Sequence, residues 1–401
     1  MIDRSNMTIT GVDAVLPDRV LTDATVVIRD GLIAEVLEGW RGGPGVLDGG
    51  GATLIPGLVD THSDAFEKEI RPRPGVELPL DFALGSFEGR AAAAGVTTVF
   101  HGVAFEQSER YDRTVDQAIA MCAVIDDRAV DPVALIDHHV LHRLDVRDPD
   151  GLAGLERRLD QVSDGSDTPV RPLVSYEDHT PGQGQYTDRR WFERYVSGTR
   201  SVSLEEARRV VDELVDDRER RAAQREVAVE VLGRRALAGS ITLMAHDPTD
   251  AAEISRARVA GMTIAEFPTT HAAATAAKEQ GMRTVCGAPN ALRGTSHSGN
   301  VSARELIAGG LCDGLASDYL PSTLLGTVAA LVRSGLCALP EAVALVTAGP
   351  SESVGLHDRG RLEVGRRADL VLVDLRSTMP TVLSVVSQAR RIGAQETACA
   401  V

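Results

Sequence analysis

The sequence predicts an α/β protein built on a (β/α)₈ TIM barrel, with a small β-sandwich domain formed from both termini. Three observations lead to this prediction. Apolar, strand-like runs alternate with helical stretches through the middle of the chain, both ends are rich in strand signals, and several central runs end in ionisable residues. Such alternation is typical of repeated βα units around a parallel sheet. A barrel of about 250 residues with a small added domain also fits the length of 401 residues.

The two ends of the chain predict the small domain. A β-rich run at residues 8–16 opens the chain, and another clear strand is expected at residues 370–374. Strand-rich ends around a long middle indicate that both termini build one domain and that the barrel is inserted between them. We therefore assign residues 1–52 and 355–401 to the small β-domain, and residues 53–354 to the barrel.

The middle of the chain contains eight candidate strands for the barrel. They are residues 53–59, 97–101, 140–146, 173–177, 241–245, 262–267, 283–287 and 314–317. A barrel places its chemistry at the carboxyl ends of its strands, so the residues that end these runs are the first candidates for function. One further run, residues 203–234, is rich in Glu and Arg and predicts a solvated helix over the barrel without a catalytic role.

Composition and charge exclude several classes of function. No run approaches the roughly 18 consecutive apolar residues of a membrane span, and the N-terminal residues lack the apolar region of a signal peptide. The net charge of −16 argues against broad binding to nucleic acid or to anionic membranes. The five scattered cysteines favour reduced thiols over a disulfide framework. We expect a cytoplasmic protein without nucleic-acid or membrane partners.

The strongest chemical signal is an apolar strand that ends in His62-Ser63-Asp64. Because side chains alternate along a strand, His62 and Asp64 point to the same side. An imidazole beside a carboxylate suits a divalent metal ion such as zinc, manganese or iron. A turn that contains a histidine and an aspartate by chance is the alternative, and the preceding run from Pro56 to Thr61 favours the metal.

The motifs of this chain resemble those of the amidohydrolase superfamily. The general resemblance rests on residues 56–62, 95–98 and 365–369. A narrower resemblance, to the phosphonate-metabolism diphosphatases of that superfamily, rests on further segments that occur in the same order over nearly the whole chain. They are His62-Ser63-Asp64 with residues 71–74, and residues 178–183, 265–270, 287–290, 296–300 and 317–319.

The narrower resemblance implies hydrolysis of α-D-ribose 1-methylphosphonate 5-triphosphate to the 5-phosphate and diphosphate. The resemblance to the superfamily implies a homodimer and a divalent metal cofactor, with zinc expected and manganese or iron as alternatives. Two positions depart from the usual superfamily pattern. The common H-x-H motif is His62-Ser63-Asp64 here, and the sixth strand carries Glu266 where many members have histidine. The count of one or two ions therefore stays open.

Four further residues are candidate metal ligands, and one of them is also the candidate catalytic residue. The resemblance places a ligand at His246, with a hydrogen-bonded rim histidine as the alternative. It makes Asp318, which closes the eighth strand, a ligand or the base that takes a proton from water; a helix N-cap is the alternative. Asp145 ends the third strand where glutamate is usual, and His179 is a comparable candidate after the fourth strand.

Two polar segments are candidates for binding a small anionic, phosphorylated substrate. In the segment after the metal motif, the candidates are Lys68, Arg71 and Arg73. Arginine offers paired donors to phosphate oxygens, and a solvated surface loop is the alternative. In the segment after the seventh strand, where such barrels commonly bind phosphate, the candidates are Arg293, His297 and Asn300. A capped helix start is the alternative there.

Two rival functions remain open. A hydrolase of C–N bonds, such as a deacetylase, a deaminase or a cyclic-amide hydrolase, would use the same activated water. An uncharged amide would not require the basic segment or the polar segment at residues 296–300. A non-enzymatic binding protein is the second rival, and the retained candidate ligands argue against it.

Overall fold

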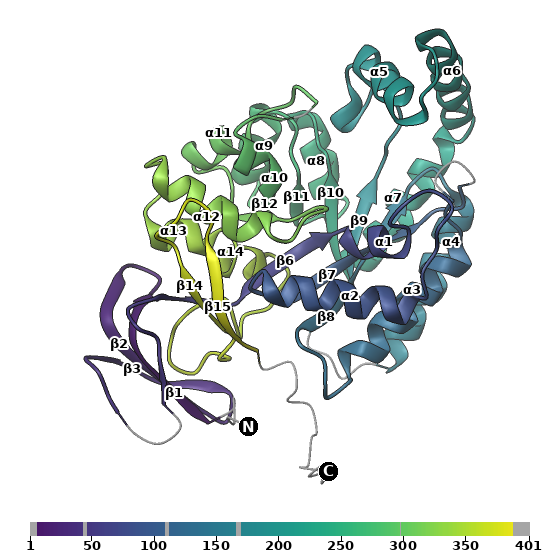
Figure 1. Ribbon diagram of the computed structural model, residues 1–401. Helices are drawn as coiled ribbons and strands as arrows, with labels where there is room; N and C mark the ends of the chain where they lie inside the picture. The colour runs from purple at the N-terminus through teal and green to yellow at the C-terminus, as the bar shows by residue number, and fades with distance from the viewer. Residues whose placement is uncertain (1–5, 43–45, 109–111, 166–169, 297, 388–401) are drawn as a thin grey trace.

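The computed structural model describes residues 6–42, 46–108, 112–165, 170–296 and 298–387. Within them, eight strands form a parallel sheet in which each strand pairs with the next along the chain, as Figure 1 shows. The strands are β6 (Leu58–Ser63), β7 (Val96–Phe105), β8 (Asp137–Asp145), β9 (Leu173–Glu177), β10 (Thr242–His246), β11 (Ile264–Glu266), β12 (Arg283–Gly287) and β13 (Gly314–Ala316). The predicted barrel architecture is confirmed.

The first and last strands of this sheet meet at their carboxyl ends. A parallel bridge joins Ser63 to Asp318. The Asp318 N–H donates to the carbonyl of His62 at 2.9 Å, and the Asp64 N–H donates to the carbonyl of Asp318 at 2.5 Å. The barrel therefore closes through backbone hydrogen bonds of residues that the sequence predicts to bind metal, which fixes the ends of β6 and β13 relative to each other.

The inside of the barrel is filled by one apolar side chain from each of seven consecutive strands. They are Phe100, Leu141, Leu173, Met244, Ile264, Val285 and Ala316. Their neighbours in sequence, such as Val99, Leu243 and Leu315, belong to a second cluster with the buried residues of the surrounding helices. Because side chains alternate along a strand, each strand has one face inside the barrel and one against the helices.

Helices cover the outside of the barrel (Figure 1). They are α1 (Ala65–Ile70), α2 (Leu80–Ala93), α3 (Val115–Ala129), α4 (Pro149–Gly165), α7 (Ala222–Leu237), α8 (Ala251–Val259), α9 (His271–Glu279), α10 (Ala288–Arg293), α11 (Ala303–Ala308), α12 (Thr323–Arg333), α13 (Leu339–Ala344) and α14 (Ala348–Ser353). In α3, the hydroxyl of Thr114 caps the first turn by accepting from the Gln117 N–H. Its buried residues Ala118, Cys122 and Ile125 recur at helical spacing and face the barrel.

Both ends of the chain contribute to one small sheet, as the sequence predicts. In the described residues its strands are β1 (Met7–Val15), β2 (Val20–Arg29), β3 (Leu32–Glu38), β4 (Val46–Asp48), β5 (Thr53–Pro56), β14 (Leu370–Asp374) and β15 (Thr381–Val386). The C-terminal strand β14 pairs with β5, and β5 pairs with β1. Apolar residues such as Ile9, Val26 and Leu370 form a core of its own for this sheet.

The run at residues 53–59, expected as one strand, is divided between the two sheets. β5 belongs to the small sheet and β6 to the barrel, with Gly57 between them. A Cβ atom at Gly57 would lie 2.1 Å from the Thr97 hydroxyl oxygen, so only glycine allows this close approach of β7. The Gly57 N–H donates to the carbonyl of Asp369 at 2.8 Å, which ties the junction to the C-terminal part of the chain.

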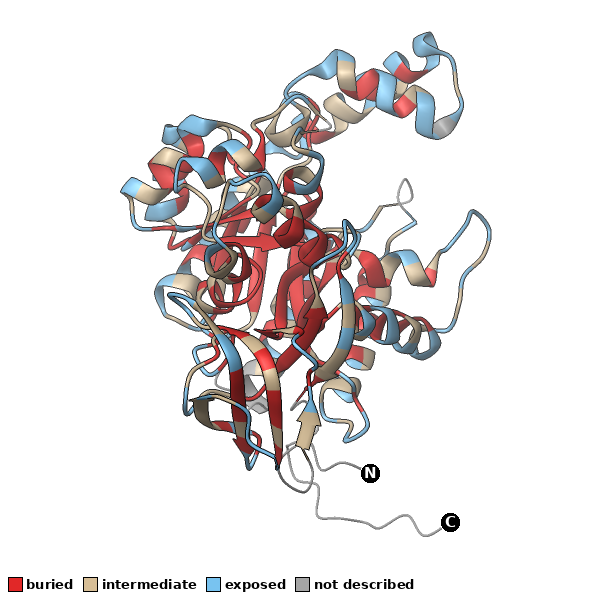
Figure 2. Cartoon of the chain, turned by 60° about the vertical axis from the view of Figure 1, so that its left-hand side comes forward, coloured by how far each residue is buried: buried red, intermediate tan, exposed pale blue. Residues whose placement is uncertain are grey.

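A helical hairpin, α5 (Arg189–Arg200) and α6 (Leu204–Arg220), projects from the barrel after a short 3₁₀ turn η1 (Gly184–Tyr186). Figures 1 and 2 show it standing away from the rest of the chain. Its core is its own and contains Phe192, Val196, Ala207 and Val211. The run at residues 203–234 is helical as expected, but it breaks at Arg221 into α6 and α7. Of the helices described, none is both long and apolar enough to cross a membrane.

Candidate metal and active site

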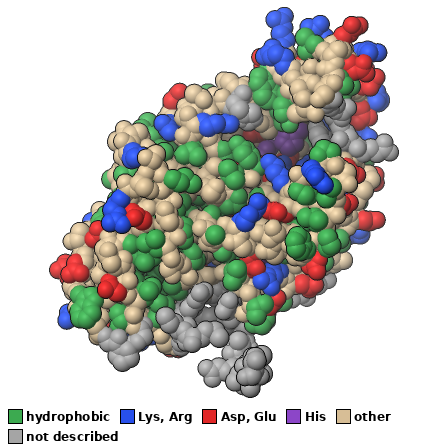
Figure 3. All heavy atoms as spheres, in the orientation of Figure 1, with side chains coloured by type: hydrophobic (Ala, Val, Ile, Leu, Met, Phe, Trp, Pro, Cys, Tyr) green, Lys and Arg blue, Asp and Glu red, His purple; other side chains and the backbone are tan. Residues whose placement is uncertain are grey.

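A cavity of about 840 Å³ opens at the carboxyl ends of the barrel strands. Figure 3 shows histidine side chains at the bottom of a cleft between the α5–α6 hairpin and the barrel. All six residues predicted as metal ligands line this cavity. They are His62, Asp64, Asp145, His179, His246 and Asp318. The strand-end positions thus bring together residues that lie more than 250 positions apart in the sequence.

Glu266 lies between the two buried histidines of the cavity floor. Its two carboxylate oxygens are 2.7 Å from Nδ1 of His62 and 2.8 Å from Nδ1 of His246. The Ser175 hydroxyl donates a further hydrogen bond to Glu266 at 2.9 Å. A carboxylate that accepts from Nδ1 leaves Nε2 of the same ring free for a metal ion. Glu266, at the end of β11, therefore fixes the orientation of both rings.

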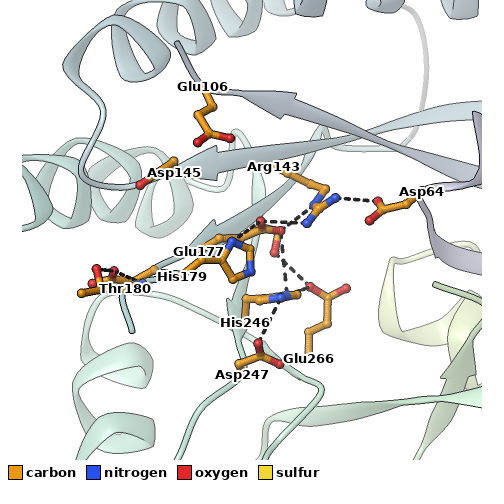
Figure 4. A network of polar contacts seen from close by, with 12 residues as sticks. Asp64, Glu106, Arg143, Asp145, Glu177, His179, Thr180, His246, Asp247 and Glu266 are labelled. Atoms are coloured by element: carbon orange, nitrogen blue, oxygen red, sulfur yellow. Dashed lines mark hydrogen bonds and ion pairs between the residues drawn. The ribbon is translucent and has the colours of Figure 1, made fainter. Parts of the chain in front are cut away.

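Arg143 joins two carboxylates on the opposite side of the histidines (Figure 4). Its Nε and Nη2 donate to the two oxygens of Glu177 at 2.8 and 3.1 Å, and its Nη1 donates to Asp64 at 2.6 Å. A two-point contact between a guanidinium and a carboxylate is strong and fixes geometry. Arg143, from β8, therefore holds the end of β9 and the end of β6 in one arrangement.

The donor atoms of the described residues fall into three groups, each of which fits a metal ion. Within each group the donor atoms lie within 4.8 Å of one another. The groups are His62 with Asp64 and Asp318, Glu177 with His179 and His246, and His62 with His246 and Glu266. Nitrogen and carboxylate oxygen donors suit zinc, manganese and iron. The first two groups share no residue, so the cavity offers positions for one ion or for two.

Asp145 belongs to none of these groups among the described residues. Its carboxylate forms an ion pair with Arg218 of α6, which also contacts Asp178 at 3.1 Å. Figure 4 shows Asp145 beside Glu106 and apart from the histidines. Asp145, the predicted third-strand ligand, therefore forms an ion pair that holds the α5–α6 hairpin to the barrel. In this ion pair Arg218 supplies the positive charge that a metal ion would otherwise supply.

The protonation of the site reflects its excess of carboxylates. Burial alone would lower the pKa of His246, but Asp247 and Glu177 raise it to about 9. Burial likewise opposes the proton on His62, yet Glu266 and Asp64 hold its pKa well above the usual range. The two histidines therefore carry positive charge that balances the buried acids, and a divalent cation would take over this balance on binding.

Two other groups of the site, His179 and Glu177, have pKa values below their usual range. Burial lowers the pKa of His179 to about 4, so this ring is neutral near pH 7 and available as a ligand. Burial raises the pKa of Glu177, but Arg143 more than compensates and lowers it to about 2. Both groups are thus in the protonation state that metal binding requires.

Two further observations fit a bound cation. The buried Oδ2 atom of Asp247 has no hydrogen-bond partner among the described residues, and its ion pair is with Nε2 of His246 at 3.4 Å. A bound cation would take the place of the proton on that ring, since a buried carboxylate needs a positive partner. Asp247, Phe267 and Asp318 each follow a barrel strand and have φ between 51° and 59°, where side chains other than glycine are strained. Strain of this kind concentrates at functional sites.

Asp318 faces the cavity and does not cap a helix. The next helix, α12, begins at Thr323 with Ser322 at its N-cap position. Burial and the nearby Asp64 raise the pKa of Asp318. Asp318 forms a donor group with His62 and Asp64. This position is compatible with both roles that the sequence predicts for it, as a metal ligand and as a proton acceptor.

The predicted substrate-binding residues are separated by the structure. Lys68 lies over the ring of Tyr319 at 4.5 Å, Arg71 contacts Asp112 at 3.4 Å, and Arg73 is exposed. None of these three basic residues lines the cavity that holds the metal candidates, which departs from the expectation. Lys68 belongs to α1, and Arg71 is engaged by its ion pair with Asp112.

Two of the three substrate-binding candidates after the seventh strand line the cavity. Arg293 and Asn300 both line the cavity, together with Ser296 and Ser298. His297 lies outside the described residues. The loop therefore reaches the site from β12, as the position after a seventh strand predicts.

Sequence reasoning missed three residues of the site. Glu177 ends its strand as His246 does. The expectation that functional residues stand at the carboxyl ends of barrel strands would therefore have found it. Arg143 lies two positions before Asp145 and shares its side of β8, so the alternation of side chains along a strand would have placed it with Asp145. Arg218 gave no local signal, because its contacts with Asp145 and Asp178 depend on how the hairpin folds back.

Comparison with known proteins agrees with this geometry. A model described as the amidohydrolase family matches residues 211–394. The chain is 33% identical over 388 residues to the alpha-D-ribose 1-methylphosphonate 5-triphosphate diphosphatase of Escherichia coli (strain K12). That match covers 96% of this chain and 100% of the relative.

Solved structures show the same fold at lower identity. N-acetyl-D-glucosamine-6-phosphate deacetylase from Mycobacterium smegmatis has a TM-score of 0.60 at 16% identity, covering 95% of this chain and 98% of that one. Dihydropyrimidinase from Brevibacillus agri has a TM-score of 0.56 at 16% identity, covering 95% and 94%. At this identity the two likenesses concern the fold alone. Because the match to the Escherichia coli relative spans nearly the whole of both chains, the chain belongs to the amidohydrolase family, as its motifs predict.

Proposed function

We propose that the protein is a metal-dependent diphosphatase that hydrolyses α-D-ribose 1-methylphosphonate 5-triphosphate to the 5-phosphate and diphosphate. The observation that carries the proposal is full-length similarity to a diphosphatase together with complete donor groups at the barrel mouth. Either part alone is insufficient, because one barrel supports many chemistries.

The metal would be held by residues that the fold already brings together. His62, Asp64 and Asp318 would hold one ion, and Glu177, His179 and His246 would hold a second. We propose zinc, with manganese or iron as alternatives, since all three accept imidazole and carboxylate ligands. When bound, a divalent ion makes water a stronger acid near neutral pH and offsets negative charge on phosphate oxygens.

The residues of the chain supply orientation and a proton acceptor. Glu266 and Arg143 fix the imidazole and carboxylate groups, so little reorganisation is needed when a substrate enters. The carboxylate of Asp318 faces the cavity and would accept the proton of the attacking water. The water oxygen would form a bond to the phosphorus nearest the ribose, and the bond from that phosphorus to the diphosphate oxygen would break.

A side-by-side assay separates this function from the C–N alternative. Protein reconstituted with zinc, manganese or iron is offered the ribose triphosphate, N-acetylglucosamine 6-phosphate and dihydrouracil. Release of diphosphate from the first, abolished by a chelator and restored by metal, supports the proposal. Turnover of an amide with no diphosphate released would replace it with C–N hydrolysis. The homodimer and the cytoplasmic location stay predictions.

A further inference from the structure

Arg293 differs from the other arginines that line the cavity. Each of the other four has a carboxylate partner within ion-pair distance. The pairs are Arg113 with Glu67, Arg143 with Glu177, Arg218 with Asp145, and Arg221 with Asp217. Arg293, the last residue of α10, has no such partner among the described residues. Its positive charge is therefore available to a ligand without the loss of an existing ion pair.

The segment that follows Arg293 presents hydroxyl and amide groups to the same cavity. Ser296 and Ser298 have their hydroxyl oxygens 3.1 Å apart, and Asn300 donates to the Ser298 hydroxyl at 2.9 Å. Gly294 and Gly299 both have φ of 81°, a conformation that glycine adopts without strain and that lets the segment turn back on itself. The segment thus offers several small hydrogen-bonding groups beside one uncompensated cation.

The opposite side of the cavity has a different character. Tyr186, Tyr195 and Leu214 of the hairpin region line it, and they follow β9, the fourth strand. Arg218 and Arg221 of α6 line it too, but Asp145 and Asp217 balance their charges. Arg293 follows β12, the seventh strand, so the two sides are three strands apart in the ring of eight. Figure 1 shows the hairpin and α10 on different sides of the mouth. The metal candidates at the strand ends lie between the hairpin side, where tyrosines and charge-balanced arginines stand, and the side of Arg293, whose charge has no ion-pair partner among the described residues.

We propose that Arg293, with the hydroxyls of Ser296 and Ser298, binds the two distal phosphates, which leave together as diphosphate. The proposal rests on the proposed function and adds an orientation, with the ribose toward the hairpin tyrosines. Arginine binds phosphate oxygens through paired donors, and an arginine without an ion pair pays no cost of breaking one. A substrate whose distal end is uncharged would gain nothing from this side of the cavity.

Binding of inorganic diphosphate to the metal-loaded protein, measured by calorimetry, tests the proposal without turnover. Arg293→Met should weaken diphosphate binding by about tenfold or more, because a charge-assisted, paired contact is lost. Arg221→Met is the matched control, since it removes another arginine of the same cavity whose charge Asp217 already balances. It should change the affinity by less than about twofold. Arg293→Lys should restore part of the affinity. Arg293 and Arg221 are both exposed, so all three variants should keep the wild-type melting temperature.

The outcomes separate this inference from the function on which it rests. Equal affinity in wild type and Arg293→Met, or an equal loss in Arg221→Met, would overturn the inference even if the triphosphate is hydrolysed. Loss of diphosphate binding in Arg293→Met alone supports the anion subsite even if the natural substrate proves to be another phosphorylated compound. Absence of diphosphate binding in the wild type would remove the subsite.

Discussion

Glu266 is the residue on which the candidate metal centre depends most. It is fully buried, and it contacts both central histidines through separate carboxylate oxygens. One carboxylate therefore orients two rings. Asp318 has a different role, because it faces the cavity and lies in a donor group with His62 and Asp64.

Replacing Glu266 with Gln should weaken metal binding by about 10- to 100-fold. The amide offers one oxygen, so only one of the two Nδ1 atoms keeps its acceptor, and the other ring loses its orientation. Competition with a chelator measures the change in affinity. Ser175→Ala is the matched control, because it removes only the third hydrogen bond to Glu266 and should have a much smaller effect. Wild-type affinity in the Glu266 variant would show that the carboxylate does not orient the ligands.

Replacing Asp318 with Asn should lower turnover by about 10²- to 10⁴-fold while the protein stays folded. The amide cannot accept a proton, but it keeps the size of the side chain and the backbone hydrogen bonds that close the barrel. Steady-state release of diphosphate measures the effect, and circular dichroism checks the fold. Near wild-type turnover would remove Asp318 from the chemistry.

At the scale of elements, the α5–α6 hairpin stands away from the barrel (Figure 2). It has its own small core, and Arg218 anchors it through Asp145 and Asp178. The anchor is buried, whereas most other ion pairs of α6 are exposed. The sequence predicts the helical character of residues 203–234 from its composition, but the break at Arg221 and the contact of Arg218 depend on tertiary packing.

Replacing Arg218 with Met should destabilise the protein by about 3 kcal/mol, because it leaves the largely buried carboxylate of Asp145 without its ion-pair partner, whereas Asp178 keeps Arg147. Arg220→Met provides the control. Its ion pair with Asp217, at 3.2 Å, is exposed and should contribute about 0.5 kcal/mol or less. Urea unfolding measures both changes, and hydrogen exchange over residues 189–220 should increase only in the Arg218 variant. Equal small effects would contradict the anchor.

At the scale of the whole molecule, buried carboxylates couple stability to pH. Glu88 of α2 accepts from His138 of β8 at 3.1 Å and forms an ion pair with Arg128 of α3 at 2.5 Å. Burial opposes the charge, but these partners lower its pKa from 4.5 to about 2. A carboxyl whose pKa is lower in the folded state stabilises the fold above its unfolded pKa, and this contribution is lost as the pH falls from 4.5 toward 2.

Glu88→Gln should therefore reduce the free energy of unfolding at pH 6 by about 3 kcal/mol. The difference from wild type should shrink as the pH is lowered through the range between the two pKa values. Urea unfolding at several pH values provides the comparison. A difference that stays constant with pH would mean that Glu88 contributes through packing alone.

Much of the fold follows from local pattern, and the site follows only in part. Seven of the eight barrel strands occur where the apolar runs predict them, because each of these runs is locally complete. The division of residues 53–59 was not predicted, since it depends on the contact of Gly57 with Thr97. His62 and His246 follow from the strand-end rule, whereas the ion pair of Asp145 with Arg218 requires the folded hairpin.

The central claim is that this metal centre cleaves a phosphoric anhydride. Phosphorus NMR of the metal-reconstituted protein with α-D-ribose 1-methylphosphonate 5-triphosphate tests it most directly. We expect equal amounts of diphosphate and 5-phosphate, formed only while metal is present. Release of single phosphates, unchanged product formation after chelation, or an intact triphosphate with every metal tried would contradict it.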